Sequence, residues 1–283
     1  MFFEILIAFT LRESTMNPTD FFETYEFCPD LAGFVGIELE SFTVDATSGL
    51  VVPAAGRFLD GMRRSTWGEE LSACQVEFRT RPLRSESDIR TELVRRFAEG
   101  DRRATQLGLR LDFTEVGPAD MPLDVFPGNA RYLQIAQNLG TDRLRAACRV
   151  AGLHIHYGVR DWEHAIAVYT ALREILPELV AAGDGSKGER MRLYKEVAVR
   201  CDPPAIRSKE ELYAAAVEYG FADNPRNCWW TIRISPFGTV EVRVFGTTRC
   251  LDRILGHVRE VQRIASRQRE SSQPLAWLPR LGW

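Results

Sequence analysis

The stretch Gly36-Ile37-Glu38-Leu39-Glu40 alternates aliphatic and carboxylate side chains, and this alternation decides the fold class. In a β-strand, residues i and i+2 point to the same face, so both carboxylates share one side of the strand. Three further stretches place carboxylate, imidazole or guanidinium groups two residues apart: Gln75-Val76-Glu77-Phe78-Arg79, Leu153-His154-Ile155-His156 and Thr239-Val240-Glu241-Val242-Arg243. The sequence therefore predicts a sheet with one apolar face and one face that carries reactive groups.

The segments between these stretches contain residue patterns typical of helices and turns. Helices between strands are common in parallel sheets, but the Pro236-Phe237-Gly238 hairpin signal and the alternating strands favour an antiparallel sheet. Pro177 should split one of the helices. The predicted fold class is α+β, an antiparallel sheet flanked by helices, in one domain over residues 16–283. We expect strands near 34–44, 73–80, 109–116, 154–159, 228–235 and 239–245, and helices near 85–108, 130–150, 162–182, 208–219 and 251–269.

The composition of the 283 residues argues against several classes of protein. A net charge of −3 provides no basic surface for bulk nucleic-acid or anionic-membrane binding. Six cysteines without a CxxC pair argue against a zinc ribbon and a disulfide-rich secreted domain. Residues 1–9 are apolar but too few to span a bilayer, and they lack the basic flank of a signal peptide.

From these observations we expect a cytoplasmic protein with no nucleic-acid or membrane partner. Translation could begin at Met16, so residues 1–15 are expected to be a non-essential extension. The sequence leaves a homo-oligomer open.

The charged strand faces predict a metal and phosphate site. Mg²⁺ and Mn²⁺ accept carboxylate oxygens, and the imidazoles of His154 and His156 can add nitrogen ligands. A single Glu-x-Glu strand is usually a solvated edge, whereas four strands of this kind favour a functional site. Four carboxylates on these faces would repel one another unless cations lay between them: Glu38, Glu40, Glu77 and Glu241. Fixed positive charge for phosphate or carboxylate oxygens comes from Arg79, Arg233 and Arg243.

Metal ions beside arginines are suited to phosphoryl transfer from ATP. No P-loop and no kinase motif occurs, so a nucleotide would be held in another way. The His-x-His stretch lacks the HExxH or cysteine partners of a zinc hydrolase.

The order and spelling of these strands resemble the bacterial carboxylate–amine ligases of the glutamate–cysteine ligase type 2 family. The resemblance covers about residues 34–269, and its most specific parts are the His154 strand and the last hairpin. It implies a glutamine-synthetase-like fold, in which the antiparallel sheet curls into a funnel. It also implies ATP-dependent amide formation between an amine and a carboxylate, commonly the γ-carboxylate of glutamate, through an acyl phosphate.

The resemblance also implies roles for individual residues. Arg233 and Arg243 would hold phosphate or the substrate carboxylate, and Arg192 matches a further family arginine; these three arginines would be the catalytic residues. The residues that would share the metal ions are Glu38, Glu40, Glu77, His156 and Glu241.

Two loops, one further position and the C-terminus depart from the family pattern. The two loops are Val116-Gly117-Pro118-Ala119 and Gly183-Asp184-Gly185-Ser186, and Gly246 stands where the family usually has Asp. The C-terminal helical region of longer members is not matched after about Arg269. We therefore expect the phosphate chemistry to be kept and leave the substrate pair unassigned. The alternatives are a phosphotransferase on the same scaffold and a non-catalytic nucleotide- or metal-binding regulatory protein.

Overall fold

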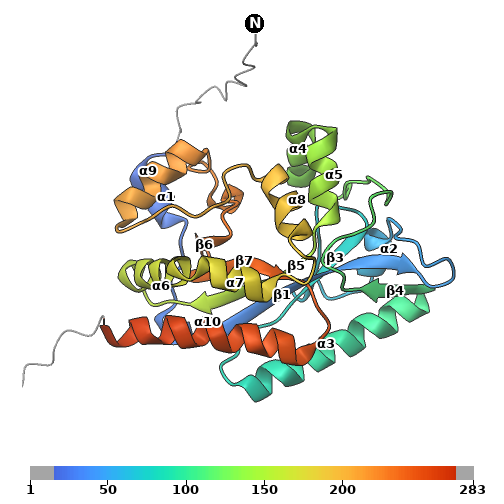
Figure 1. The fold of residues 1–283 in the computed structure, drawn as a ribbon, viewed down its shortest axis with the longest axis horizontal. Helices are drawn as coiled ribbons and strands as arrows, with labels where there is room; N and C mark the ends of the chain where they lie inside the picture. Colours follow the sequence, from blue (N-terminus) through green and yellow to red (C-terminus); the bar gives the residue numbers. More distant parts are fainter. Residues whose placement is uncertain (1–15, 272–283) are drawn as a thin grey trace, which may run out of the picture.

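A seven-stranded antiparallel sheet forms the centre of the computed structural model, which describes residues 16–271 (Figure 1). The order of the strands is β2-β3-β1-β5-β7-β6, and β4 pairs with the C-terminal part of β1 beyond its pairing with β5. This arrangement confirms the α+β prediction. The strands are β1 (Val35–Asp45), β2 (Trp67–Glu69), β3 (Gln75–Arg79), β4 (Leu109–Asp112), β5 (Gly152–Gly158), β6 (Ile232–Ser235) and β7 (Thr239–Gly246).

Helices lie on both sides of the sheet (Figure 1). The long helices α3 (Glu86–Gln106) and α10 (Leu251–Ser271) and the helix α6 (Trp162–Glu174) pack on the apolar face. On the opposite side stand α4 (Ala130–Leu139), α5 (Thr141–Arg149) and α8 (Glu189–Val197). The remaining helices are α1 (Pro18–Glu23), α2 (Ala55–Leu59), α7 (Leu176–Gly183), α9 (Lys209–Tyr219) and the 3₁₀ turns η1 (Pro29–Leu31) and η2 (Pro225–Asn227).

The apolar members of the alternating strands form the core. Ile37, Leu39, Phe78 and Val242 are each at most 1% exposed and belong to one continuous cluster with residues of α3, α6 and α10. A slip of one residue in the pairing would exchange the two faces of a strand, so this burial specifies the register. The same register holds the charged side chains on the opposite face.

Several helix boundaries follow the capping signals in the sequence. The Ser85 hydroxyl accepts a hydrogen bond from the Asp88 backbone N–H at 3.1 Å, and Ser208 accepts one from Glu211 at 3.2 Å. The expected break near Pro177 is present, because α6 ends at Glu174 and α7 begins at Leu176. These local predictions are confirmed.

Other boundaries differ from the prediction for identifiable reasons. The helix expected over 130–150 breaks at Gly140, whose φ of +72° is readily adopted only by glycine. The strand expected over 228–235 begins only at Ile232, and the backbone before it has partners outside the sheet: the Cys228 carbonyl accepts a hydrogen bond from Arg233, and the Thr231 N–H donates one to the Cys201 carbonyl. The strand expected over 109–116 ends at Asp112. The short elements β2, α1, α2 and α8 were not predicted.

The expected extension, residues 1–15, lies outside the described residues, and the single domain over 16–283 stays a prediction. Within residues 16–271, no helix is both long enough and apolar enough to cross a bilayer.

Candidate active site

The strand register gathers the predicted charged residues around the middle of β1. Glu38 lies opposite Arg79 on β3 and His154 on β5, and Glu40 lies opposite Glu77. The two nitrogens of His154 lie 3.5 Å from a Glu38 oxygen and 3.6 Å from a Glu40 oxygen. Arg79 Nε donates a hydrogen bond to Glu77 at 2.6 Å. Residues far apart in the sequence thus form one cluster.

A second part of the cluster surrounds Glu241 on β7. This carboxylate is fully buried and accepts hydrogen bonds from Arg233, at 2.7 Å, and from Arg243. His156 Nε2 lies 3.9 Å from Glu241, while its Nδ1 lies 3.0 Å from the Thr239 hydroxyl. That contact with Thr239 orients the ring and leaves Nε2 directed into the site.

The surroundings of the carboxylates shift their pKa values in opposite directions. Burial alone would raise the pKa of Glu241, but the guanidinium groups of Arg233 and Arg243 hold it well below its usual range. Burial and the neighbouring carboxylates of Glu38 and Glu70 raise the pKa of Glu77. Burial with the charges of Glu40 and Glu38 raises the pKa of Glu70 to about 8. The part of the site around β3 therefore has unbalanced negative charge.

These side chains fit divalent cations. His154 Nδ1 and His156 Nε2 are buried without a hydrogen-bond partner in the described part of the chain, and both lie 3.5 Å from the same oxygen of Glu38. Buried polar atoms are normally satisfied, and a bound metal ion would satisfy both of these nitrogens. Carboxylates with imidazole suit Mg²⁺ or Mn²⁺. Three groups have ligand atoms within 4.8 Å of one another: Glu38/His156/Glu241, Glu38/Glu77/His154 and Glu40/Glu70/Glu77.

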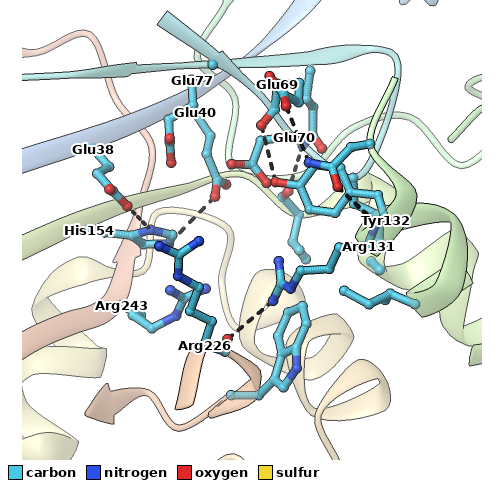
Figure 2. A pocket seen from close by; sticks show the side chains of 18 of the residues that line it. Glu38, Glu40, Glu69, Glu70, Glu77, Arg131, Tyr132, His154, Arg226 and Arg243 are labelled. Carbon is cyan, nitrogen blue, oxygen red and sulfur yellow. Dashed lines mark hydrogen bonds and ion pairs between the residues drawn. The ribbon is translucent and has the colours of Figure 1, made fainter. Parts of the chain in front are cut away.

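A cavity of about 710 Å³ opens over this cluster (Figure 2). That volume lies within the range of small-molecule sites. The sheet forms one wall of the cavity, and α4, α5 and α8 supply the opposite wall. Its acidic lining consists of Glu38, Glu40, Glu69, Glu70 and Glu77, and its arginines include Arg79, Arg131, Arg226, Arg233 and Arg243. The cavity therefore offers negative charge to cations and positive charge to anions.

Arg192, expected to be catalytic, is not among the residues that line the cavity. Its side chain is 58% exposed and pairs with Glu196 on the surface of α8. Two positions earlier on the helix, Arg190 is buried and lines the cavity. The structure thus does not support the assignment of Arg192 and brings Arg190 into the site instead.

Arg190 braces an irregularity in the sheet. Leu153 pairs with Phe245 and Ile155 with Val242, so β7 carries one more residue than β5 at this point. The Arg190 guanidinium donates hydrogen bonds to the carbonyls of Ala151, Arg243 and Val244 at 2.9–3.1 Å. It thereby satisfies backbone groups next to the bulge and holds the backbone of Arg243 in place.

Two of the departures from the family pattern, Gly246 and the loop over residues 183–186, are in contact through Glu115. A Cβ added at Gly246 would lie 2.1 Å from the Glu115 side chain. The Glu115 carboxylate fills this space and accepts hydrogen bonds from the backbone of Gly185, at 2.8 Å, and of Ser186, at 3.0 Å. The Ser186 hydroxyl in turn accepts the N–H of Arg190 in the first turn of α8. The changed loop therefore anchors the helix that carries Arg190.

Sequence reasoning missed several other residues of the cavity wall. Glu70, Arg131, Tyr132 and Tyr194 line the cavity from β2's end, α4 and α8. The adjacent acidic pair Glu69-Glu70 and the pair Arg131-Tyr132 were the available signals. Neither has a spacing that distinguishes it from a solvated surface.

Comparisons with known proteins show which family the chain resembles. The sequence pattern of Glutamate-cysteine ligase family 2 matches residues 34–259. A protein of Saccharopolyspora erythraea, named provisionally as a glutamate–cysteine ligase 2-2, is 29% identical over 234 residues, covering 74% of this chain and 59% of the relative. A Mycobacterium sp. (strain KMS) protein with the same provisional name is 31% identical over 234 residues, covering 74% and 62%. The chain thus spans about three fifths of the length of these relatives.

The fold also matches a solved structure. The crystal structure of a bifunctional glutathione synthetase from Pasteurella multocida aligns with 85% of this chain and 38% of its own, with a TM-score of 0.55. At 13% sequence identity this likeness concerns the fold alone.

Proposed function

Because the chain belongs to glutamate–cysteine ligase family 2, we propose that it is an ATP- and Mg²⁺-dependent ligase that joins a carboxylate to an amine through an acyl phosphate. The γ-carboxylate of glutamate is the first candidate for the acid. The observation that carries the proposal is the register of β3, β1, β5, β7 and β6. It collects carboxylates, imidazoles and guanidinium groups on one sheet face beneath a cavity.

The chain's own groups would divide the work as follows. Mg²⁺ or Mn²⁺, when bound, would neutralise charge on the triphosphate of ATP. Arg79, Arg233 and Arg243 would position phosphate or carboxylate oxygens, and their ion pairs with Glu77 and Glu241 keep the guanidinium groups fixed. The residues that would hold the ions are Glu38, Glu40, Glu77, His154, His156 and Glu241.

The proposed reaction has two steps. An oxygen of the substrate carboxylate attacks the γ-phosphorus of ATP, the bond to the bridging oxygen breaks, and ADP leaves. The amine nitrogen then attacks the acyl carbon, phosphate leaves with the electrons of its C–O bond, and the amine gives up a proton. The cavity wall from α4, α5 and α8 would limit access of water to the acyl phosphate.

A cytoplasmic location fits this proposal. ATP and amino acids are supplied there, and all six cysteines are free thiols.

The test is to supply the protein with ATP, Mg²⁺, single amino acids as acids and a panel of amines, and to measure ADP and amide. We expect ADP release that requires both an acid and an amine, with one amide formed per ADP. A stable phosphorylated product without amide would support the phosphotransferase instead. Nucleotide binding without turnover of any pair would support the regulatory protein.

Glu38→Gln tests the proposed site, because Glu38 belongs to two of the three candidate metal groups. We expect it to lower ADP release by about 100-fold or more. Glu218→Gln is the matched control, because Glu218 pairs with Arg200 on the surface. Equal activity of the two variants would contradict the proposed site.

A further inference from the structure

Two arginines of the cavity, Arg233 and Arg243, use most of their guanidinium donors on the protein itself. Arg233 donates from Nε to Glu241, at 2.7 Å, and from Nη1 to the Cys228 carbonyl, at 2.8 Å. Arg243 donates from Nη1 to Glu241 and from Nε to the Tyr194 hydroxyl, at 3.4 Å. In the part of the chain that the structure describes, neither Nη2 has a hydrogen-bond partner. Both residues line the cavity, so these two donors remain for the oxygens of a ligand.

The hydroxyl of Tyr194 connects the two arginines. It donates a hydrogen bond to the Trp229 carbonyl at 3.0 Å and accepts the one from Arg243 Nε. The carbonyl of the preceding residue, Cys228, is the one that holds Arg233. A hydroxyl that donates a hydrogen bond becomes a better acceptor, so the contact with Trp229 strengthens the contact with Arg243. One side chain thus fixes Arg243 directly and also fixes the backbone segment that holds Arg233.

Packing leaves the ring of Tyr194 little freedom. The residue is 6% exposed and belongs to a buried cluster that includes Met191 and Cys201. Arg190 lies one turn earlier on the same face of α8, and its guanidinium donates to the Arg243 carbonyl at 3.1 Å. Helix α8 therefore holds Arg243 at two points, with Arg190 at the backbone and Tyr194 at the guanidinium.

We propose that Tyr194 is a positioning residue of the active site, which sets the orientation of the Arg243 guanidinium and so presents its Nη2 to the phosphate or carboxylate oxygens of a ligand. The proposal rests on the proposed function, in which Arg243 binds these oxygens. Without the hydroxyl, Arg243 keeps Glu241 as its partner on one side, and the guanidinium can rotate about that contact. The advantage of a preorganised donor is then partly lost.

The test compares two variants of the full chain that each delete one buried hydroxyl. Tyr194→Phe removes the proposed positioning contact. Tyr169→Phe is the matched control, because the Tyr169 hydroxyl donates to the Pro204 carbonyl at 2.6 Å and this residue does not line the cavity. Because both variants lose buried hydrogen bonds, their melting temperatures should both fall slightly. A role in stability alone therefore predicts similar behaviour of the two in every other measurement.

A ligand-free measurement follows the arginine itself. In proton–nitrogen correlation spectra, the Nε–H resonance of Arg243 is identified as the one that Arg243→Lys removes. We expect Tyr194→Phe to shift this resonance or to broaden it beyond detection, because the Nε–H loses its acceptor. Tyr169→Phe should leave it unchanged. A resonance that Tyr194→Phe does not affect would overturn the proposal.

Binding supplies the functional measurement. Calorimetry with Mg²⁺ present compares a non-hydrolysable ATP analogue and L-glutamate in the wild type, Tyr194→Phe, Arg243→Lys and the double variant. For the ligand that Arg243→Lys weakens, we expect Tyr194→Phe to lower the affinity by about three- to tenfold. The double variant should stay within about twofold of Arg243→Lys, because both changes act on one contact.

Two binding results would contradict the proposal. Losses of affinity that add fully in the double variant would mean that Tyr194 acts independently of Arg243. A Tyr169→Phe variant that loses as much affinity as Tyr194→Phe would show that the effect comes from general destabilisation.

The outcome can be separated from that of the proposed function. ADP release by the wild type, with an unchanged Arg243 resonance and unchanged affinities in Tyr194→Phe, would remove the positioning role alone. Affinities that depend on Tyr194 through Arg243, without ADP release from any pair of acid and amine, would keep the positioning role and remove the ligase.

Discussion

Glu241 and the pair Glu70 and Glu77 belong to one cluster, yet their surroundings shift their pKa values in opposite directions. Glu241 is fully buried and is neutralised by Arg233 and Arg243, which keep its pKa low. Glu70 and Glu77 are crowded by other carboxylates, which with burial raise their pKa values. The comparison shows that the β7 side is balanced by the chain itself, whereas the β3 side, where Arg79 pairs with Glu77, still has more carboxylates than this arginine balances.

The largest expected effect is on the balanced side. Glu241→Gln leaves Arg233 and Arg243 without their carboxylate, and their side chains are only 13% and 14% exposed. Breaking a buried charge pair in this way costs about 3–5 kcal/mol. We expect the free energy of unfolding to fall by that amount in urea titrations, together with loss of ADP release. A change as small as that of the surface variant Glu196→Gln would show that the two arginines do not depend on Glu241.

Arg190→Lys tests the support beneath the balanced side. A lysine cannot reach all three carbonyls that Arg190 binds, so buried acceptors are left unsatisfied at about 1–3 kcal/mol. We expect a lower melting temperature and a reduced kcat, because the backbone of Arg243 loses its brace. Arg192→Lys, two positions along the same helix, should change the stability by less than about 0.5 kcal/mol. Equal effects of the two variants would show that Arg192 supports the site as much as Arg190 does.

Glu77→Gln addresses the unbalanced side. Glutamine mimics the protonated carboxyl that the raised pKa favours, so the stability without metal should change by about 1 kcal/mol or less. The stabilisation by Mg²⁺ should weaken, with an apparent affinity at least about tenfold lower. Thermal melts with Mg²⁺ or with a chelator measure both quantities. A large loss of stability in the chelator would mean that Arg79 already balances Glu77.

The smallest expected effect is a difference in pH dependence. Glu70 titrates at about 4.3 in the unfolded chain and at about 8 in the folded, metal-free chain. Between these values the folded state binds the extra proton, so this group makes stability fall as the pH rises. Glu241 has the opposite sign, since its stabilisation is present above about pH 4.3 and is lost in acid.

Melting temperatures in chelator, taken near pH 5 and near pH 8, measure this difference. We expect the decrease across the interval to be smaller in Glu70→Gln than in the wild type. Identical decreases would show that Glu70 does not carry the unbalanced charge.

The predictions from sequence succeeded where a local rule connects residues to geometry. The two-residue repeat in β1, β3, β5 and β7 correctly gave each strand a polar and an apolar face, and helix caps marked α3 and α9. Arg192 was chosen from its match to a family arginine, and the structure places its side chain on the surface of α8. Residues two apart on a helix differ in direction by about 200°, so Arg190 and Arg192 cannot both face the cavity. A motif match alone does not select the correct helix face.

The chemistry of the strand faces and the α+β class follow from local sequence, because the alternation of side chains across a strand is a property of the backbone. The tertiary structure sets which charged groups meet, because the register that places Glu38 between Arg79 and His154 depends on pairing distant segments. It also decided which carboxylates are neutralised and placed Arg131 on the helical wall. Burial and charge compensation arise from packing between elements, and no local pattern encodes them.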